Sequence, residues 1–327
     1  MSKQPRRAAP VARLSDLDLP PVDLSSGPAP GRQVSVAGVD VHVRHLEPAT
    51  HAAAAEPVLL VHGLGGSTLD WTDFAQLLGT TLDVEMIDLP GFGRSGPAAG
   101  GNYSLGAQAR TVIAYLQQSG RGPVHLVGNS MGGAISILVA SQRPDLVRTL
   151  TLISPAVPDV RLRIHPLRHD PRLALVVVPG VGPMIMRRMG KIAVRARVKG
   201  TINVVFADPS RYPAQRLDEL VAETELRADK PWVIAAMTGS TRGLVRNQFV
   251  HARSTWAAIR TITAPTLVLW GDTDRLVAPD LAGFVGAAIA NARVLVLKNI
   301  GHTAMMEDPQ TSARAFFGLV EDAAVVG

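Results

Sequence analysis

The chain has 327 residues, of which 46% are hydrophobic and 18% charged, and it carries a formal net charge of +6 at pH 7. This length and composition suit one large domain, or a core with an insertion, that buries a sizeable hydrophobic interior. The absence of cysteine excludes disulfides and cysteine-ligated zinc, and no apolar stretch reaches the ~18 residues that a membrane-spanning helix needs.

Residues 1–32 contain six prolines and no long apolar run, so we expect a flexible tail that is mobile or lies against the surface. Arg6-Arg7 is not followed by a hydrophobic region, and neither a secretory nor a twin-arginine signal is indicated. We therefore expect a cytoplasmic protein, which the basic segment at 160–200 could bring to a membrane surface.

Strands and helices then alternate along the chain. Period-two alternation around Gly38 predicts an antiparallel hairpin over residues 33–43. Short apolar, β-branched runs predict strands at 58–61, 84–89, 123–127, 150–153, 266–270 and 294–297. Helices are expected at about 71–78, 105–118, 134–140 and 311–321. This order predicts an α/β fold with a mostly parallel sheet and helices on both faces.

The alternation stops near Pro155 and resumes at Thr266. The sequence between is basic, helical and interrupted by proline. We therefore predict a core made of residues 33–155 and 256–327, with residues 156–255 inserted as a basic helical cap or lid.

A G-x-S-x-G pattern occupies residues 128–132, between a predicted buried strand and a predicted helix. The pattern alone arises by chance in about one chain of this length in ten, so the context carries the argument. A strand, a tight turn and a helix are the setting of a nucleophile elbow, with Ser130 as the nucleophile. The N–H groups of Met131 and of Leu64, in the glycine-rich loop after an earlier strand, are the predicted oxyanion hole.

A serine needs a base to take its proton and a third group to orient that base. In folds with this elbow the acid and then the histidine follow the serine along the chain. His302 follows the last predicted strand, and Asp274 follows the strand before it, both at the sheet edge where such sites lie. Asp272 is the alternative acid, and Asp159 is a more distant third candidate.

These landmarks resemble the α/β-hydrolase superfamily over about residues 33–155 and 256–327. Besides the Ser130 elbow, the marks are His62-Gly63, Asp88-x-Pro90-Gly91-x-Gly93-x-Ser95, Gly271-x-x-Asp274, and Gly301-His302 with Glu307 and Pro309. The resemblance implies the α/β-hydrolase fold with an inserted cap. It implies chemistry that needs no cofactor, and no cluster of potential ligands has metal-binding spacing in the sequence.

Serine at the nucleophile position implies an acyl-enzyme and a carbonyl substrate, since related dehalogenases and epoxide hydrolases carry aspartate there. Carboxylic ester hydrolysis is the first hypothesis. Hydrolysis of carbon–carbon bonds is the second, because meta-cleavage-product hydrolases often share Gly-Asn-Ser-Met-Gly-Gly, as at 128–133. Their oxyanion loop usually reads Gly-x-Gly-Pro-Gly, unlike residues 63–67 here. A hydrolase-fold protein that binds a ligand with little turnover is the third.

Ten basic residues and one acidic residue give residues 160–200 a formal charge of +9. An apolar run at 173–186 lies among them. This pattern suggests contact with an anionic membrane surface or an amphiphilic substrate. The simpler alternative is that the run packs over the core and the charges are solvated.

Binding to nucleic acid is not expected, because the sequence contains no recognised nucleic-acid-binding motif. Four methionines would suit a flexible acyl pocket or ordinary core: Met184, Met186, Met189 and Met237.

Overall fold

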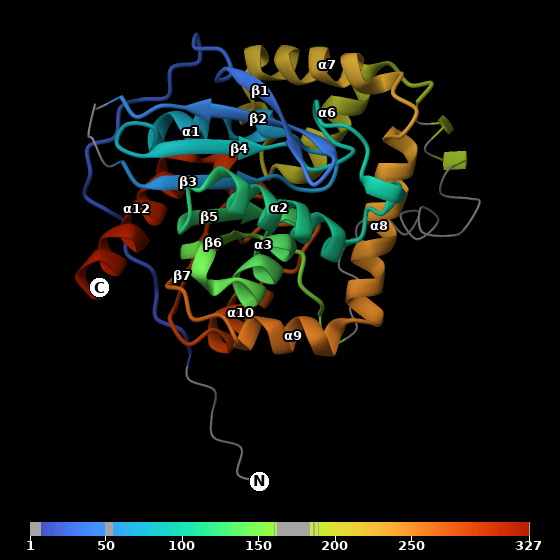
Figure 1. The fold of residues 1–327 in the computed structure, drawn as a ribbon. Helices are drawn as coiled ribbons and strands as arrows, with labels where there is room; N and C mark the ends of the chain where they lie inside the picture. The colour runs from blue at the N-terminus through green and yellow to red at the C-terminus, as the bar shows by residue number, and fades with distance from the viewer. Residues whose placement is uncertain are drawn as a thin grey trace.

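The computed structural model describes residues 8–49, 55–159, 161, 184–185, 187–188 and 190–326. Its centre is an eight-stranded sheet with helices on both faces, as Figure 1 shows. This arrangement confirms the predicted α/β-hydrolase fold class.

The strand order is β1-β2-β4-β3-β5-β6-β7-β8. Strands β1 and β2 form the predicted hairpin, β2 pairs antiparallel with β4, and every later pairing is parallel. Strand β3 has β4 on one side and β5 on the other, so the direction in which strands are added reverses there. In open α/β sheets, binding sites lie at the carboxyl ends of the strands at such a reversal. The strands are β1 (Gly31–Val36), β2 (Val39–Leu46), β3 (Pro57–Val61), β4 (Asp83–Ile87), β5 (Val124–Asn129), β6 (Val147–Ile153), β7 (Thr266–Gly271) and β8 (Ala292–Leu297).

The helices cover the sheet because its central strands are apolar on both faces. In β3, Leu59 and Val61 pack into one cluster, while Val58 and Leu60 pack into the other. The first cluster is covered by α2 (Leu105–Ser119), α3 (Met131–Gln142), α9 (Ala252–Arg260) and α10 (Leu281–Ala288). The second is covered by α1 (Thr72–Leu78), α11 (Ala304–Glu307) and α12 (Pro309–Val326). Short 3₁₀ turns are η1 (Thr68–Trp71), η2 (Ala99–Gly101), η3 (Pro144–Leu146) and η5 (Pro209–Arg211).

Between β6 and β7 the chain forms α6 (Val194–Val205), α7 (Ala214–Ala228) and α8 (Val233–Phe249). In Figure 1, α7 runs along the top of the molecule and α8 down one side. The predicted boundary at 255/256 falls inside α9, which packs on α3, so the domain limits stay a prediction. Most of the apolar run at 173–186 lies outside the described residues, as do Met186 and Met189.

The described residues 8–30 run along the surface of the core. Val11 forms a parallel bridge with Val294 of β8, and the Ser15 N–H donates to the Arg314 carbonyl at 2.9 Å. Arg13 forms ion pairs with Glu321 and Asp322 of α12. This part of the chain therefore lies against the surface of the core.

Candidate active site

Ser130 lies in a strained turn between β5 and α3, with φ 54° and ψ −116°. A Cβ added to Gly128 would lie 2.5 Å from the Gly132 carbonyl oxygen, and one added to Gly132 would lie 2.1 Å from that of Val61. Only glycine fits at these two positions. The chain therefore makes the sharp, closely packed turn that a nucleophile elbow requires, and Ser130 remains partly accessible.

The loop after β3 passes directly beside the elbow. A Cβ on Gly63 would lie 3.3 Å from the Ser130 Cβ, so the following residue, Leu64, belongs to a loop that adjoins the serine. Met131 opens α3 and is fully buried. The loop that contains Leu64 and the first residue of α3 therefore both adjoin Ser130, and the N-terminus of α3 favours negative charge.

His62 fixes the shape of that loop. Its Nε2 accepts the Leu89 N–H at 3.0 Å, so the proton is on Nδ1, which donates to the Gly63 carbonyl at 2.7 Å. Burial lowers the pKa of His62, and the ring is therefore neutral. This hydrogen bond from His62 holds the Gly63 carbonyl in place.

Asp274 and His302 are in direct contact. The His302 Nδ1 lies 2.8 Å from the Asp274 Oδ2, and both residues are 3% exposed. The Asp274 Oδ1 accepts the N–H groups of Leu276 and Val277 at 2.8 and 3.0 Å. Burial opposes ionisation of Asp274, but the nearby imidazole and these N–H groups outweigh it and lower the pKa of the carboxyl.

The other two candidate acids are occupied elsewhere. Asp272 is exposed, and its Oδ1 accepts the Asn299 N–H at 2.8 Å. Asp159 is buried, and its carboxylate binds the Arg161 guanidinium at 2.8 Å. Of the three aspartates, Asp274 is the one that the fold brings to His302.

Asn129 links the histidine loop to the nucleophile elbow. Its Nδ2 donates to the carbonyl of His302 at 3.1 Å and to that of Ile153 at 3.1 Å. In the sequence, Asn129 stands out only as part of the Gly-Asn-Ser-Met-Gly-Gly pattern at 128–133. The signal that could have indicated this role is a polar side chain at the last position of a buried strand, directly before the proposed nucleophile.

Two helices of the insertion contact the loop after β3, at Gly65. The Arg227 Nη2 of α7 donates to the Gly65 carbonyl at 2.8 Å. The Met237 Cε of α8 lies 3.5 Å from the position of a Cβ on Gly65. Met237 is thus beside the predicted oxyanion loop, as an acyl-pocket residue would be, whereas Met184 is exposed.

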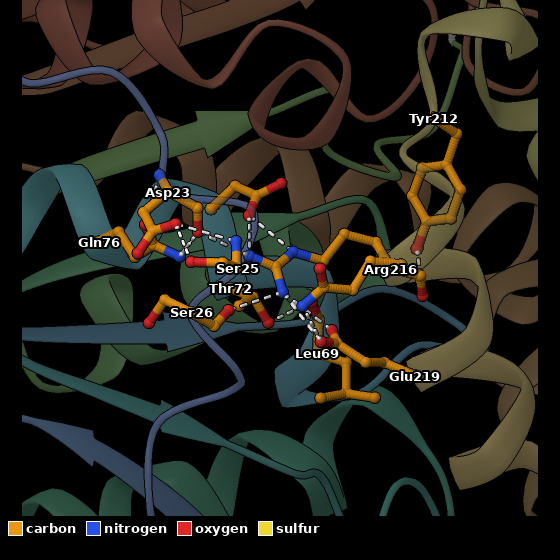
Figure 2. Close-up of polar contacts among 11 residues, drawn as sticks. Asp23, Ser25, Ser26, Leu69, Thr72, Gln76, Tyr212, Arg216 and Glu219 are labelled. Atoms are coloured by element: carbon orange, nitrogen blue, oxygen red, sulfur yellow. Dashed lines mark hydrogen bonds and ion pairs between the residues drawn. The ribbon is translucent and has the colours of Figure 1, made fainter.

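Arg216 fastens α7 to the core. Figure 2 shows its guanidinium between the α7 residue Glu219 and the N-terminal segment, where it donates to the Ser26 carbonyl at 2.9 Å. The Arg216 Nε also donates to the carboxylate of Asp73 on α1 at 2.8 Å, and Arg216 is 4% exposed. Three segments far apart in the sequence are therefore joined by one buried cation.

Within the described ranges, no group of three or more His, Asp and Glu side chains is placed to hold a metal ion. None of the helices in that part of the chain combines the length and apolar composition needed to cross a bilayer.

Residues 56–309 match a family described as the alpha/beta hydrolase fold. The chain is 26% identical over 264 residues to monoacylglycerol lipase abhd6-B of Xenopus laevis, covering 79% of this chain and 73% of that protein. It is 27% identical over 280 residues to a 2-hydroxy-6-oxononadienedioate/2-hydroxy-6-oxononatrienedioate hydrolase of Cupriavidus pinatubonensis, covering 83% and 87%. The solved structure of a membrane phospholipase A, described as a bacterial virulence factor, superposes with a TM-score of 0.69 at 25% identity, covering 90% and 86%.

Proposed function

Because this chain belongs to the α/β-hydrolase fold family, we propose that it is a serine hydrolase that cleaves carboxylic esters through an acyl-enzyme. The proposed substrates carry an apolar or amphiphilic acyl group. The proposed catalytic residues are Ser130, His302 and Asp274, with the N–H groups of Leu64 and Met131 as the oxyanion hole.

In this mechanism the Ser130 Oγ attacks the ester carbonyl while the His302 Nε2 takes its proton. The negative charge that develops on the carbonyl oxygen is stabilised by the N–H groups of Leu64 and Met131. The tetrahedral intermediate collapses, and His302 gives its proton to the departing alkoxide. Water, deprotonated by the same nitrogen, then hydrolyses the acyl-enzyme. Asp274 accepts the hydrogen bond from the His302 Nδ1–H, which orients the ring and stabilises the imidazolium.

The 2.8 Å contact between Asp274 and His302 is the observation that carries this proposal. With Nδ1–H donated to a buried carboxylate, Nε2 is the nitrogen suited to act as the base. The Asn129 bond to the His302 carbonyl supports the placement, because Asn129 is the residue next to Ser130. The lipase named among the relatives supports an ester substrate.

The test is hydrolysis of p-nitrophenyl esters from acetate to palmitate by the wild type and by Ser130→Ala. We expect turnover by the wild type, loss of turnover in the variant, and a chain-length optimum set by the acyl pocket. Ligand binding with no multiple turnover on any ester would overturn the proposal in favour of a binding role.

A carbon–carbon hydrolase is the second candidate, favoured by the Cupriavidus relative and by the Gly-Asn-Ser-Met-Gly-Gly sequence at 128–133. The same nucleophile would serve both reactions. A vinylogous 1,5-diketone assayed beside the esters separates them: a kcat/KM higher for the diketone than for every ester would favour the second candidate.

We propose further that residues 156–255 act as a cap over the substrate and that its basic part contacts anionic membrane at its surface. Lys191, Arg195 and Lys199 are exposed, and Ile192 beside them is 50% exposed. Exposed cations around an exposed apolar side chain suit a phospholipid headgroup region. Co-sedimentation with liposomes tests this, and equal binding to anionic and neutral vesicles would exclude the electrostatic contact.

A further inference from the structure

Glu307 is a buried acid that the proposed chemistry leaves without a role. It ends α11, and its side chain is fully buried. Its Oε2 accepts the Gly301 N–H at 2.7 Å and the Ala207 N–H at 3.0 Å, while its Oε1 accepts the Asp208 N–H at 2.9 Å. Hydrogen bonds from N–H groups to a carboxylate are stronger than those between neutral groups. This side chain therefore fastens together the segments that it touches.

One of those segments is the loop that carries the proposed base, since Gly301 precedes His302. The other two N–H groups belong to the insertion, directly after α6. The two segments also bond to each other without Glu307, because the His302 N–H donates to the Val205 carbonyl at 2.7 Å. A Cβ on Gly301 would lie 2.4 Å from that carbonyl oxygen, so the contact leaves no room for a side chain.

The loop that carries the proposed acid reaches the same place. Arg275, which follows Asp274, donates from its Nη1 to the Asn203 carbonyl in the last turn of α6 at 2.7 Å. Carbonyls at the end of a helix have no partner inside the helix, so they are free to accept such bonds. The C-terminal end of α6 is thus bonded to the loops on both sides of the Asp274–His302 contact.

We infer that Glu307 is a positioning residue, which uses the C-terminal end of α6 to hold the His302 loop at its working distance from Ser130. This inference rests on the proposed function for its kinetic consequence. It makes residues 203–208 of the insertion a fixed part of the catalytic apparatus.

The main test is Glu307→Gln, which keeps the size of the side chain. An amide has one acceptor oxygen, so its NH₂ group must face at least one of the three N–H donors. Misplacement of a catalytic group by about 1 Å costs up to about 100-fold in rate. We expect kcat for the best p-nitrophenyl ester to fall about 10- to 100-fold while KM changes less than threefold. The matched control is Glu225→Gln, an exposed acid on α7, which should leave both constants unchanged.

Active-site titration with a fluorophosphonate distinguishes positioning from simple loss of folded protein. A positioning role lowers kcat per titrated site. Fewer titrated sites with a wild-type kcat per site would overturn the inference. If Glu307→Gln does not fold, Arg275→Met is measured instead, because the hydrogen bond from the Arg275 Nη1 to the Asn203 carbonyl lies at the surface. We expect it to lower kcat about threefold to tenfold, and an unchanged kcat would count against the inference.

Hydrogen exchange measures the coupling without any substrate. In the variant, residues 203–208 and 299–303 should both exchange faster than in the wild type, whereas residues 124–129 of β5 should not change. Faster exchange in only one of the two segments would overturn the coupling. If the wild type hydrolyses no ester, the proposed function fails, and the exchange result still decides whether Glu307 joins the two segments.

Discussion

Asp274→Asn tests the proposed acid, because the substitution should change which ring nitrogen of His302 carries the proton. In the wild type, the Asp274 Oδ1 accepts two backbone N–H groups, from Leu276 and Val277, and its Oδ2 faces the His302 Nδ1. An asparagine keeps its carbonyl oxygen on the two N–H groups, because otherwise both would lose their acceptor. Its NH₂ group then faces Nδ1, which must become an acceptor, and the imidazole proton moves to Nε2.

That tautomer cannot take a proton from Ser130. Loss of the correct tautomer in a serine protease triad lowers kcat about 10⁴-fold, and each factor of ten corresponds to about 1.4 kcal/mol. We therefore expect a barrier increase of about 5 kcal/mol in Asp274→Asn at pH 7, measured as kcat on the best p-nitrophenyl ester. Thermal unfolding should show that the variant is folded.

The matched control is Asp272→Asn. This side chain is exposed and accepts the Asn299 N–H, so we expect kcat within about threefold of the wild type. Two results would refute the reasoning: kcat of Asp274→Asn within tenfold of the wild type, or a larger loss in Asp272→Asn than in Asp274→Asn.

Three further predictions concern stability. Gly132→Ala should destabilise the fold by about 3 kcal/mol or more in urea unfolding, because its Cβ would meet the Val61 carbonyl oxygen, whereas Gly283→Ala in α10 has open space and should stabilise by up to about 1 kcal/mol. Arg216→Met should cost about 3 kcal/mol because it leaves Asp73 without its buried cation, while Arg195→Met at the surface should cost less than about 0.5 kcal/mol; equal costs would contradict this account. Burial raises the pKa of Asp70 to about 7 from 3.8, so the unfolded chain ionises before the folded one, and stability should fall as the pH rises from about 4 to about 7. The full shift corresponds to about 4 kcal/mol, and partial exposure of Asp70 reduces our expectation to about 1–2 kcal/mol. In unfolding measured at several pH values, Asp70→Asn should reduce the loss of stability by that amount, and the loss that remains includes Glu223, whose pKa burial also raises.

The sequence determined the features that depend on local chemistry. Period-two and continuous apolar runs fix which segments form strands, because a buried strand must be apolar on the faces that it covers. The elbow is signalled locally by the glycines on both sides of Ser130, which leave room for the backbone that packs against the turn. The order of serine, acid and histidine along the chain then limited the candidate site to a few residues at one edge of the sheet.

Only the tertiary structure decided which of the candidates meet. Asp272 and Asp274 are two residues apart in one loop, and spacing favoured Asp274, but the contact with His302 depends on how the ends of β7 and β8 lie together. Glu307, Asn129 and Arg216 could not be assigned partners from the sequence, because their hydrogen bonds reach 100, 173 and 190 residues along the chain. Local patterns carry no information about such pairs, since it is the folding of the sheet and the insertion that brings them together.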